Sequence, residues 1–133
     1  MIHKAVMDTS AICALAFEEP GADKVIARLR GGGCVMHAVN ASEICFTLPQ
    51  KRPGEFDRRF ARALLDDFGV EVMPVLFDEA WIAVVAEIRL KARALNIGDG
   101  AAVALAGALD MPLVTAEKAF LEAAGFARIE LIR

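Results

Sequence analysis

The sequence contains no tyrosine, one tryptophan, three cysteines and two histidines. Cys13, Cys34 and Cys45 form no CxxC pair, and the histidines are not spaced to complete a zinc site with them. We therefore expect three reduced and largely buried thiols instead of a structural zinc centre. His3 and His37 fall in expected strands away from the acidic residues described below, which favours core or edge positions.

A membrane segment and a secretory signal are also missing from the sequence. No apolar run reaches the roughly 20 residues that span a bilayer, and Asp8 falls where the apolar part of a signal peptide should continue. We therefore expect a cytoplasmic protein without membrane contact. Because 56% of the 133 residues are hydrophobic, we assign residues 1–133 to one compact domain with a sizeable core.

An excess of basic residues is absent as well, since the formal net charge is -3. Proteins that coat nucleic acid without sequence preference are normally basic, so this balance argues against a passive binder. No serine stands in the G-x-S-x-G pattern of many serine hydrolases. Gly31, Gly32 and Gly33 precede an expected strand instead of opening a helix, so they do not form a phosphate-binding loop.

Short apolar segments alternate with amphipathic segments along the chain. Strands are expected at residues 2–7, 34–37, 70–73, 111–114 and 129–132. Helices are expected at residues 11–17, 21–30, 40 to about 48, 53–68, 79–94 (capped by Asp78), 99–109 and 115–124. This alternation predicts an α/β fold in which a parallel sheet is covered by helices on both faces.

Four acidic residues each lie in the first turn of an expected helix: Asp8, Glu43, Asp99 and Glu117. The alternation places all four helix N-termini at the carboxyl edge of the sheet, where open α/β sheets bind ligands. Taken singly, each acid could be a helix cap or a favourable charge at a helix N-terminus, and Asn40 with Glu43 has the spacing of a capping box. Together, the carboxylates would repel one another unless a cation lay between them.

Carboxylate oxygens without nearby sulfur or imidazole are typical ligands of Mg²⁺ or Mn²⁺. Such ions activate water and neutralise the charge that develops on a phosphodiester during hydrolysis, often as a pair roughly 4 Å apart. Thr9, Ser10 and Thr115 stand beside the acids, where their hydroxyls could orient water or phosphate, or could cap helices. We treat these residues and Asn40 as supporting residues of a site for phosphodiester hydrolysis.

The same positions carry a family resemblance. Four segments resemble the successive motifs of PIN-domain nucleases, and their order and separation are similar to those of VapC toxins from bacterial toxin–antitoxin pairs. The segments are Val6-Met7-Asp8-Thr9-Ser10-Ala11, Asn40-Ala41-Ser42-Glu43, Gly98-Asp99 and Leu113-Val114-Thr115-Ala116-Glu117-Lys118. The resemblance extends over essentially the whole chain.

The resemblance implies a parallel sheet in the order 3-2-1-4-5 and a Mg²⁺-dependent endoribonuclease, with Mn²⁺ as an alternative ion, that is the toxin of a type II toxin–antitoxin system. It also implies that Asp8, Glu43 and Asp99 are the main metal ligands. Glu117 stands where the family usually has an aspartate, and its extra methylene moves the carboxylate outward. It therefore binds an ion directly, acts through water, or only supports the residues that bind the ion, which affects a second ion more than the first. The implied partners are an RNA substrate, a VapB-like antitoxin that blocks the acidic crevice, and a second copy of the chain in a homodimer.

The densest basic stretch contains Lys51, Arg52, Arg58, Arg59 and Arg62. These side chains could guide RNA phosphates toward the acidic crevice, or could form an ordinary solvated helix face. The same region contains an apolar series at four-residue spacing: Phe56, Phe60, Leu64 and Phe68. That spacing favours core or dimer contacts over base stacking.

Two other functional classes stay open. One is a different acidic-site phosphoryl-transfer protein, although a haloacid-dehalogenase-like phosphatase needs a second aspartate where the chain has Ser10. A phosphorylated receiver needs an aspartate at the end of the third strand, where the chain has Met73 and Pro74. The other class is a catalytically silent interaction module in which the acids only cap helices, and Mn²⁺ binding separates that module from a nuclease.

Overall fold

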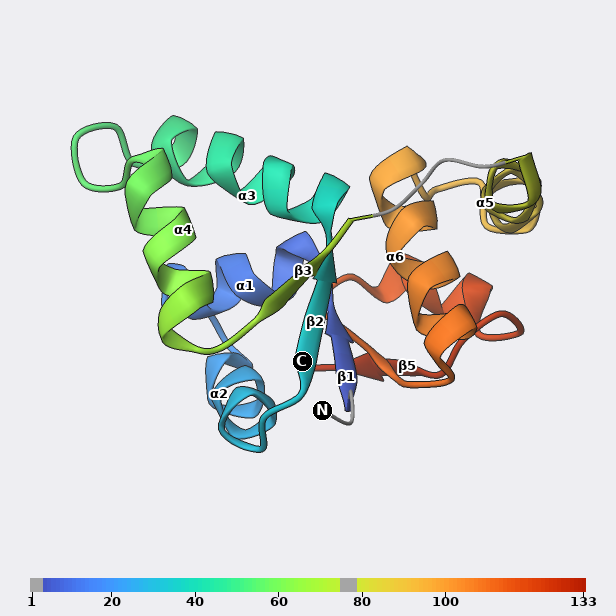
Figure 1. The fold of residues 1–133 in the computed structure, drawn as a ribbon, viewed down its shortest axis with the longest axis horizontal. Helices are drawn as coiled ribbons and strands as arrows, with labels where there is room; N and C mark the ends of the chain where they lie inside the picture. The colour runs from blue at the N-terminus through green and yellow to red at the C-terminus, as the bar shows by residue number, and fades with distance from the viewer. Residues whose placement is uncertain (1–3, 75–78) are drawn as a thin grey trace.

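Short parallel strands form one sheet at the centre of the molecule in a computed structural model, which describes residues 4–74 and 79–133 (Figure 1). The strands are β1 (Ala5–Met7), β2 (Cys34–His37), β3 (Glu71–Met73), β4 (Leu113–Thr115) and β5 (Ile129–Leu131). All neighbouring pairs are parallel, and their order is β3-β2-β1-β4-β5. The expected sheet and its order are confirmed, so the carboxyl ends of all strands lie at one edge.

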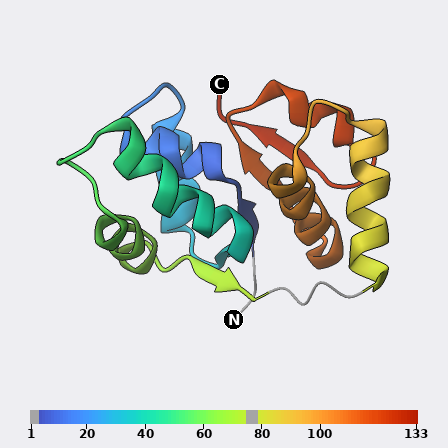
Figure 2. The ribbon, with the colours of Figure 1, turned by 90° about the horizontal axis from the view of Figure 1, so that it is seen from above.

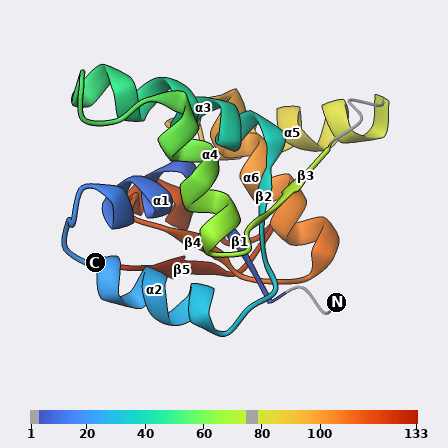
Figure 3. The same ribbon diagram turned by 60° about the vertical axis from the view of Figure 1, so that its left-hand side comes forward.

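Two groups of helices cover the two faces of the sheet (Figure 2). The first group contains α1 (Thr9–Ala16), α2 (Ala22–Arg30), α3 (Ala38–Lys51) and α4 (Arg58–Asp67). The second contains α5 (Glu79–Lys91), α6 (Ile97–Leu109) and the 3-10 helix η1 (Lys118–Ala123). Figure 3 brings the first group toward the viewer, with the sheet behind it. The expected coverage of both faces is confirmed.

Strand side chains alternate between the two faces and build two separate cores. Ala5 and Met7 of β1 pack with the first helix group, whereas Val6 between them packs with the second. Val114 and Leu113 of β4 divide in the same way, with Val114 in the first core and Leu113 in the second. Burial on both faces explains why these strands consist of nearly uninterrupted apolar residues.

Helix α4 begins later than the apolar spacing predicts. Asp57 has an extended backbone and accepts a hydrogen bond from the amide of Phe60 (2.9 Å), so the helix starts at Arg58 instead of residue 53. Phe56 therefore precedes the helix and stacks on Phe60, with ring centroids 4.5 Å apart. The apolar series contributes to the first core as expected, except that Phe60 is 36% exposed.

Helix α3 begins earlier and ends later than expected. The Nδ1 atom of His37 accepts a hydrogen bond from the amide of Val39 (3.0 Å), which makes His37 the N-cap and Ala38 the first helical residue. Asn40 consequently lies inside the helix, so the expected start at residue 40 is wrong and the alternative that Asn40 and Glu43 form a capping box is excluded. The helix also continues beyond Pro49, which lies within its last turn.

The remaining differences concern the ends of other elements. Helix α5 ends at Lys91 and not at residue 94, and the last expected helix is the 3-10 helix that starts at Lys118. Asp78 and His3, for which a cap and a strand position are expected, lie outside the described residues. The expected core position of His37 is confirmed, because this residue is buried and its ring lies 5.3 Å from that of Trp81.

The cysteines agree with the sequence analysis. Cys13 and Cys34 are buried and Cys45 is half-buried, and all three thiols are free. Burial is also the main cause that raises the pKa of Cys13 to about 11. The thiol of Cys13 is therefore protonated at neutral pH. Across residues 4–74 and 79–133, no helix combines the length and the hydrophobicity needed to cross a membrane.

Candidate active site

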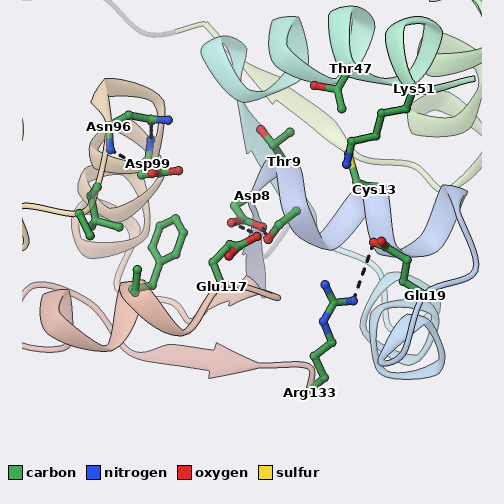
Figure 4. Close-up of a pocket in the computed structure, with 15 residues that line it drawn as sticks. Asp8, Thr9, Cys13, Glu19, Thr47, Lys51, Asn96, Asp99, Glu117 and Arg133 are labelled. Atoms are coloured by element: carbon green, nitrogen blue, oxygen red, sulfur yellow. Dashed lines mark hydrogen bonds and ion pairs between the residues drawn. The ribbon is translucent and has the colours of Figure 1, made fainter.

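A cavity of about 390 Å³ opens at the carboxyl edge of the sheet (Figure 4). Asp8 reaches it from the end of β1, Asp99 from the first turn of α6, and Glu117 from the segment that follows β4. Glu43 of α3 lies beside the cavity, where its carboxylate accepts a hydrogen bond from the cavity residue Thr9. The fold therefore places three of the four acids in the wall of one cavity and Glu43 beside it.

Asp8 is only 3% exposed and is the N-cap of α1. Its Oδ1 atom accepts a hydrogen bond from the amide of Ala11 (2.9 Å), and its Oδ2 atom accepts one from the hydroxyl of Thr115 (2.7 Å). The Ser10 hydroxyl lies 2.9 and 3.0 Å from the two carboxylate oxygens and accepts a hydrogen bond from the amide of Ala116 (2.9 Å). These contacts tie the end of β1 to the end of β4 and fix the carboxylate.

The carboxylate of Glu43 is held by hydrogen bonds from two other side chains. Its Oε1 atom accepts hydrogen bonds from the Thr9 hydroxyl (3.0 Å) and from Nδ2 of Asn40 (2.9 Å). Asn40 is 1% exposed and also donates to the backbone carbonyl of Gly98 (3.1 Å), which connects α3 to α6. A Cβ atom on Gly98 would lie 2.6 Å from Oε1 of Glu43, so glycine leaves the space that this carboxylate occupies.

Asp99 takes part in a capping box, although it is not the cap. Asn96 is the N-cap of α6, and its Oδ1 atom accepts a hydrogen bond from the amide of Asp99 (2.8 Å). In return, Oδ2 of Asp99 accepts a hydrogen bond from the amide of Asn96 (3.0 Å), which starts the helix at Ile97 instead of residue 99. Within the described chain, the other carboxylate oxygen of Asp99 receives no hydrogen bond and is available to a ligand.

Glu117 is exposed and precedes η1 as its N-cap residue. Its side chain makes no capping hydrogen bond, whereas its backbone amide donates to the hydroxyl of Thr115 (3.1 Å). The carboxylate instead lines the cavity. Helix capping therefore does not explain the position of this acid, in contrast to Asp8.

Burial and mutual repulsion both disfavour negative charge in this site. Burial raises the pKa of Asp8 to about 7, and the nearby charge of Asp99 adds to the rise. Hydrogen bonds from Thr115, Ala11 and Ser10 oppose it. The pKa of Asp99 is also raised, first by burial and then by the charges of Glu43 and Glu117, against the lowering effects of the Asn96 amide and of Arg89.

The donor set fits a hard divalent cation by its chemistry, because the acids at the cavity supply carboxylate oxygens, and the Cys13 thiol, which also lines the cavity, has a pKa raised to about 11. A cation would favour the ionised forms of Asp8 and Asp99, which burial now disfavours. Among the described residues, however, no three acid, histidine or cysteine side chains stand close enough together to hold an ion as they are. The longer side chains of Glu43 and Glu117 would have to turn toward an ion shared with the two aspartates.

The basic stretch reaches the cavity at one position. Lys51 lines it from the end of α3. Arg52 instead lies over the rings of Phe17 (4.9 Å) and Phe56 (5.7 Å), and its Nη1 atom lies 3.4 Å from Glu55. The other three arginines, Arg58, Arg59 and Arg62, belong to α4, which Arg58 begins. None of these three side chains lines the cavity.

Sequence reasoning missed several residues of the cavity wall. Arg133 follows β5 and Glu19 follows α1, and the two side chains form a long ion pair of 3.8 Å. Thr47 and Asn96 also line the cavity. Arg133 could have been inferred, because it follows a strand at the same carboxyl edge as Asp8. The position of Glu19 depends on the loop after α1, for which the sequence holds no comparable signal.

Comparisons with known proteins agree on one family. A family model described as PIN domain matches residues 5–126. The VapC ribonuclease Mb2780c of Mycobacterium bovis and ribonuclease VapC42 of Mycobacterium tuberculosis are each 35% identical to this chain over 116 residues, which is 82% of this chain and 87% of theirs.

Solved structures agree on the fold. PAE2754 from Pyrobaculum aerophilum has a TM-score of 0.64 at 24% identity, covering 97% of this chain and 85% of its own. FitAcB from Neisseria gonorrhoeae has a TM-score of 0.68 at 19% identity, covering 96% and 97%. A FitAB structure bound to an IR36 DNA fragment has a TM-score of 0.68 at 20% identity, covering 96% and 94%. At these identities, the likeness concerns the architecture alone.

Proposed function

The chain belongs to the PIN-domain family, and on that premise we propose that it is a Mg²⁺- or Mn²⁺-dependent endoribonuclease and the toxin of a type II toxin–antitoxin system. Two relatives named as VapC ribonucleases, aligned over most of the chain, support the choice of RNA as substrate. The observation that carries the proposal is the meeting of Asp8, Asp99 and Glu117 in one cavity, with Glu43 beside it.

In this proposal, Asp8 and Asp99 are the principal metal ligands and Glu43 is the third. A bound ion would supply an easily deprotonated water and neutralise charge on the phosphodiester. The chain's own contribution is positioning: Ser10 and Thr115 hold the carboxylate of Asp8 by hydrogen bonds. Glu117 reaches the same cavity on a longer side chain, as a direct ligand of a second ion or through water.

Thr9 and Asn40 have a corresponding role at Glu43. Both donate to its Oε1 atom, which leaves Oε2 for a ligand, since no described group donates to that atom. Lys51 is the residue of the basic stretch that would contact RNA, because it lines the cavity. Arg52, Arg58, Arg59 and Arg62 would meet RNA only if it extended over α4.

We also propose two protein partners, a VapB-like antitoxin that covers the acidic cavity and a second copy of the chain. Several large apolar side chains are exposed for such contacts, among them Phe46 (66%), Ile82 (54%) and Leu90 (67%). The molar mass in solution tests the homodimer, since a monomer has a mass of 14.3 kDa. A mass that stays at this value at all protein concentrations would exclude the homodimer.

Cleavage of RNA tests the proposed activity directly. We expect the wild type to cleave a structured RNA in the presence of Mg²⁺ or Mn²⁺, and a chelator to abolish cleavage. Asp8→Asn should reduce the rate by about 100-fold or more, because it removes a charged ligand while keeping the shape of the side chain. The matched control is Asp23→Asn, since Asp23 is also a first-turn acid but lies on α2 and does not line the cavity.

Three outcomes would contradict the proposal: equal cleavage by the wild type and Asp8→Asn, cleavage that persists in chelator, and no cleavage by the wild type of any structured RNA tested. The first two would identify a contaminating nuclease. The third, together with no binding of Mn²⁺ near neutral pH, would favour the catalytically silent interaction module.

A further inference from the structure

We propose that Lys51 and Arg133 form a phosphate-binding subsite in the acidic cavity, and that Glu19 competes with the phosphate for Arg133. The subsite rests on the proposed nuclease function, because it would hold the RNA backbone beside the group to be cut. Figure 4 shows the division of the cavity: Lys51, Glu19 and Arg133 stand on one side, and Asp99 stands on the other, with Asp8 and Glu117 between them.

Lys51 is the first cation of this subsite. It belongs to the last turn of α3, and Figure 4 shows its side chain reaching down from that helix toward Cys13. Its ammonium group lies 5.4 Å from the centroid of the Phe17 ring. Among residues 4–74 and 79–133, no acidic side chain forms an ion pair with Lys51, so none of these residues competes with a phosphate for its ammonium group.

Arg133 is the second cation. Its Nη1 atom donates a hydrogen bond to the backbone carbonyl of Pro20 (3.0 Å), and the same atom lies 3.8 Å from Oε1 of Glu19. A guanidinium has five N–H donors in a planar fork, so the remaining donors can bind a phosphate in a bidentate manner. The 3.8 Å separation from Glu19 is too long for a hydrogen bond, which makes this contact easy to replace.

The backbone at the end of α1 and at Gly21 determines where Glu19 and Arg133 lie relative to the cavity. Helix α1 ends in a Schellman motif, in which the amide of Glu19 donates to the carbonyl of Ala14 (2.8 Å) and Glu18 adopts a left-handed conformation with φ 54°. Glutamate is less favourable than glycine in this conformation. The motif turns the chain so that Glu19 faces the cavity.

Gly21 completes this arrangement by allowing the loop to meet the end of the sheet. Its φ is +95°, and a Cβ atom there would lie 2.5 Å from the backbone oxygen of Ile132. Only glycine therefore permits the close approach that sets Pro20 and Glu19 against Arg133. Arg133 follows Ile132 directly, and the hydrogen bond from its side chain to the carbonyl of Pro20 does not depend on Glu19.

A phosphodiester substrate explains why cations belong in this cavity. Asp8, Asp99 and Glu117 repel the negative backbone of RNA, and a metal ion at the acids would offset only part of their charge. Phosphates adjacent to the reacting group need their own positive partners, and Lys51 and Arg133 line the same cavity at its other side. Contacts of this kind position a nucleic acid without reading its sequence.

The test measures RNA binding separately from cleavage. All variants carry Asp8→Asn in the full chain, so that the RNA stays intact, and binding of a fluorescein-labelled single-stranded RNA is followed by anisotropy over a range of salt concentrations. Lys51→Gln and Arg133→Gln should each weaken binding several-fold at low salt. Each should also make the slope of log affinity against log salt shallower by about 0.7, the value for one phosphate contact on a single strand.

The matched control is Arg128→Gln. Arg128 is exposed and lies at the other end of β5, where it donates to the carbonyl of Asp110, so the same change of charge is made away from the cavity. This variant should keep the affinity and the salt slope of the parent. Equal losses in Arg128→Gln and Arg133→Gln, or unchanged slopes in both Lys51→Gln and Arg133→Gln, would overturn the subsite.

Glu19→Gln gives a readout that a merely structural role of Arg133 would not produce. Removing the competing carboxylate should strengthen RNA binding several-fold at low salt, and this gain should disappear when Arg133→Gln is also present. A gain that persists in the double variant, or a loss of binding in Glu19→Gln, would contradict competition for Arg133. Thermal unfolding of every variant checks that the fold is retained.

Failure of the phosphate subsite can be distinguished from failure of the proposed nuclease activity. Cleavage and Mn²⁺ binding by the wild type test the acids, whereas the salt slopes test the cations in the Asp8→Asn background, in which we expect cleavage to be at least about 100-fold slower. RNA cleavage by the wild type with unchanged slopes in the cation variants would remove the subsite alone. Absence of any RNA binding by the Asp8→Asn chain at low salt would overturn the subsite as well.

Discussion

At the scale of single residues, Asp8 combines burial with several hydrogen bonds. The bonds from Thr115, Ala11 and Ser10 favour the ionised carboxylate, but burial has the larger effect and raises the pKa to about 7. At neutral pH the side chain therefore lies between its protonated and ionised forms. A divalent cation would favour the ionised form, so metal binding and deprotonation of Asp8 should be linked.

The pKa of Asp8 has a consequence for stability without metal. The pKa of Asp8 rises from 3.8 in the unfolded chain to about 7 in the folded chain. The stability that the protonated Asp8 side chain allows is therefore fully present below pH 3.8 and is lost as the pH rises through 7, because the folded protein then has to bury an ionised carboxylate. Asp8→Asn cannot ionise and escapes this loss. In a chelating buffer, Asp8→Asn should therefore gain stability relative to the wild type between about pH 4 and pH 7, by an amount on the order of a few kcal/mol.

Thermal unfolding in a chelating buffer over this pH range measures the difference. The gap in melting temperature between Asp8→Asn and the wild type should widen as the pH rises and stay constant above neutral pH. Asp23→Asn, which alters an exposed acid on α2, should show no such widening. A gap that does not change with pH would mean that the pKa of Asp8 is not raised in the folded protein.

At the scale of elements, the contact between α3 and α6 sets the position of Glu43. Asn40 joins the two helices by donating to Glu43 and to the carbonyl of Gly98. A side chain at position 98 would meet the far end of the Glu43 side chain, which is flexible and can move away. The contact therefore matters for the geometry of the site more than for the stability of the fold.

Gly98→Ala tests this contact. The added Cβ atom would lie 2.6 Å from Oε1 of Glu43, so we expect the carboxylate to shift and RNA cleavage to fall by about 10- to 100-fold. The melting temperature should change little, because alanine is the better helix former. Gly125→Ala is the matched control, since a Cβ atom there would meet nothing within 4 Å.

Equal activity of Gly98→Ala, Gly125→Ala and the wild type would show that the position of Glu43 does not matter for cleavage. A large loss of stability in Gly98→Ala would also contradict the argument, because it would place the effect in the fold and not in the carboxylate. Both results are obtained from the same purified variants by cleavage assays and thermal unfolding.

Apolar spacing predicts most elements of this chain, but it does not predict where they begin. His37 and Asn96 cap α3 and α6 through side-chain hydrogen bonds that depend on the local backbone. Asn40 and Asp99 are residue types that cap helices, but both lie inside the helices. Asn40 is buried and donates to Glu43 and to the carbonyl of Gly98, whereas Asp99 completes a capping box and lines the cavity. Side chains that can cap a helix can equally bind a ligand, and sequence alone does not separate the two roles.

At the scale of the whole molecule, parallel topology accounts for what could be predicted of the site. Once strands and helices alternate, residues at the start of each helix must meet at the carboxyl edge, so the alternation alone predicts the convergence of Asp8, Glu43, Asp99 and Glu117. The order of the strands follows from the resemblance to PIN-domain nucleases. The cavity wall with Glu19 and Arg133 depends on a close approach of two loops, which no spacing in the sequence predicts.

The basic stretch shows the same limit. Lys51 and Arg52 are neighbours in the sequence, yet Lys51 lines the cavity and Arg52 packs over Phe17 and Phe56. Which of two adjacent cations faces the cavity depends on the rotation of the last turn of α3. This rotation is set by tertiary packing, so a run of basic residues predicts at most the side of the molecule on which RNA would lie.

Binding of Mn²⁺ tests most directly whether the converging carboxylates form a metal site. Titration of the full chain at about pH 8, where Asp8 is ionised, can be followed by the electron paramagnetic resonance signal of free Mn²⁺. We expect saturable binding by the wild type and by Asp23→Asn, and affinities at least about tenfold weaker in Asp8→Asn and Asp99→Asn. Absence of binding by the wild type, or equal affinity in all four proteins, would contradict a metal site at this edge of the sheet.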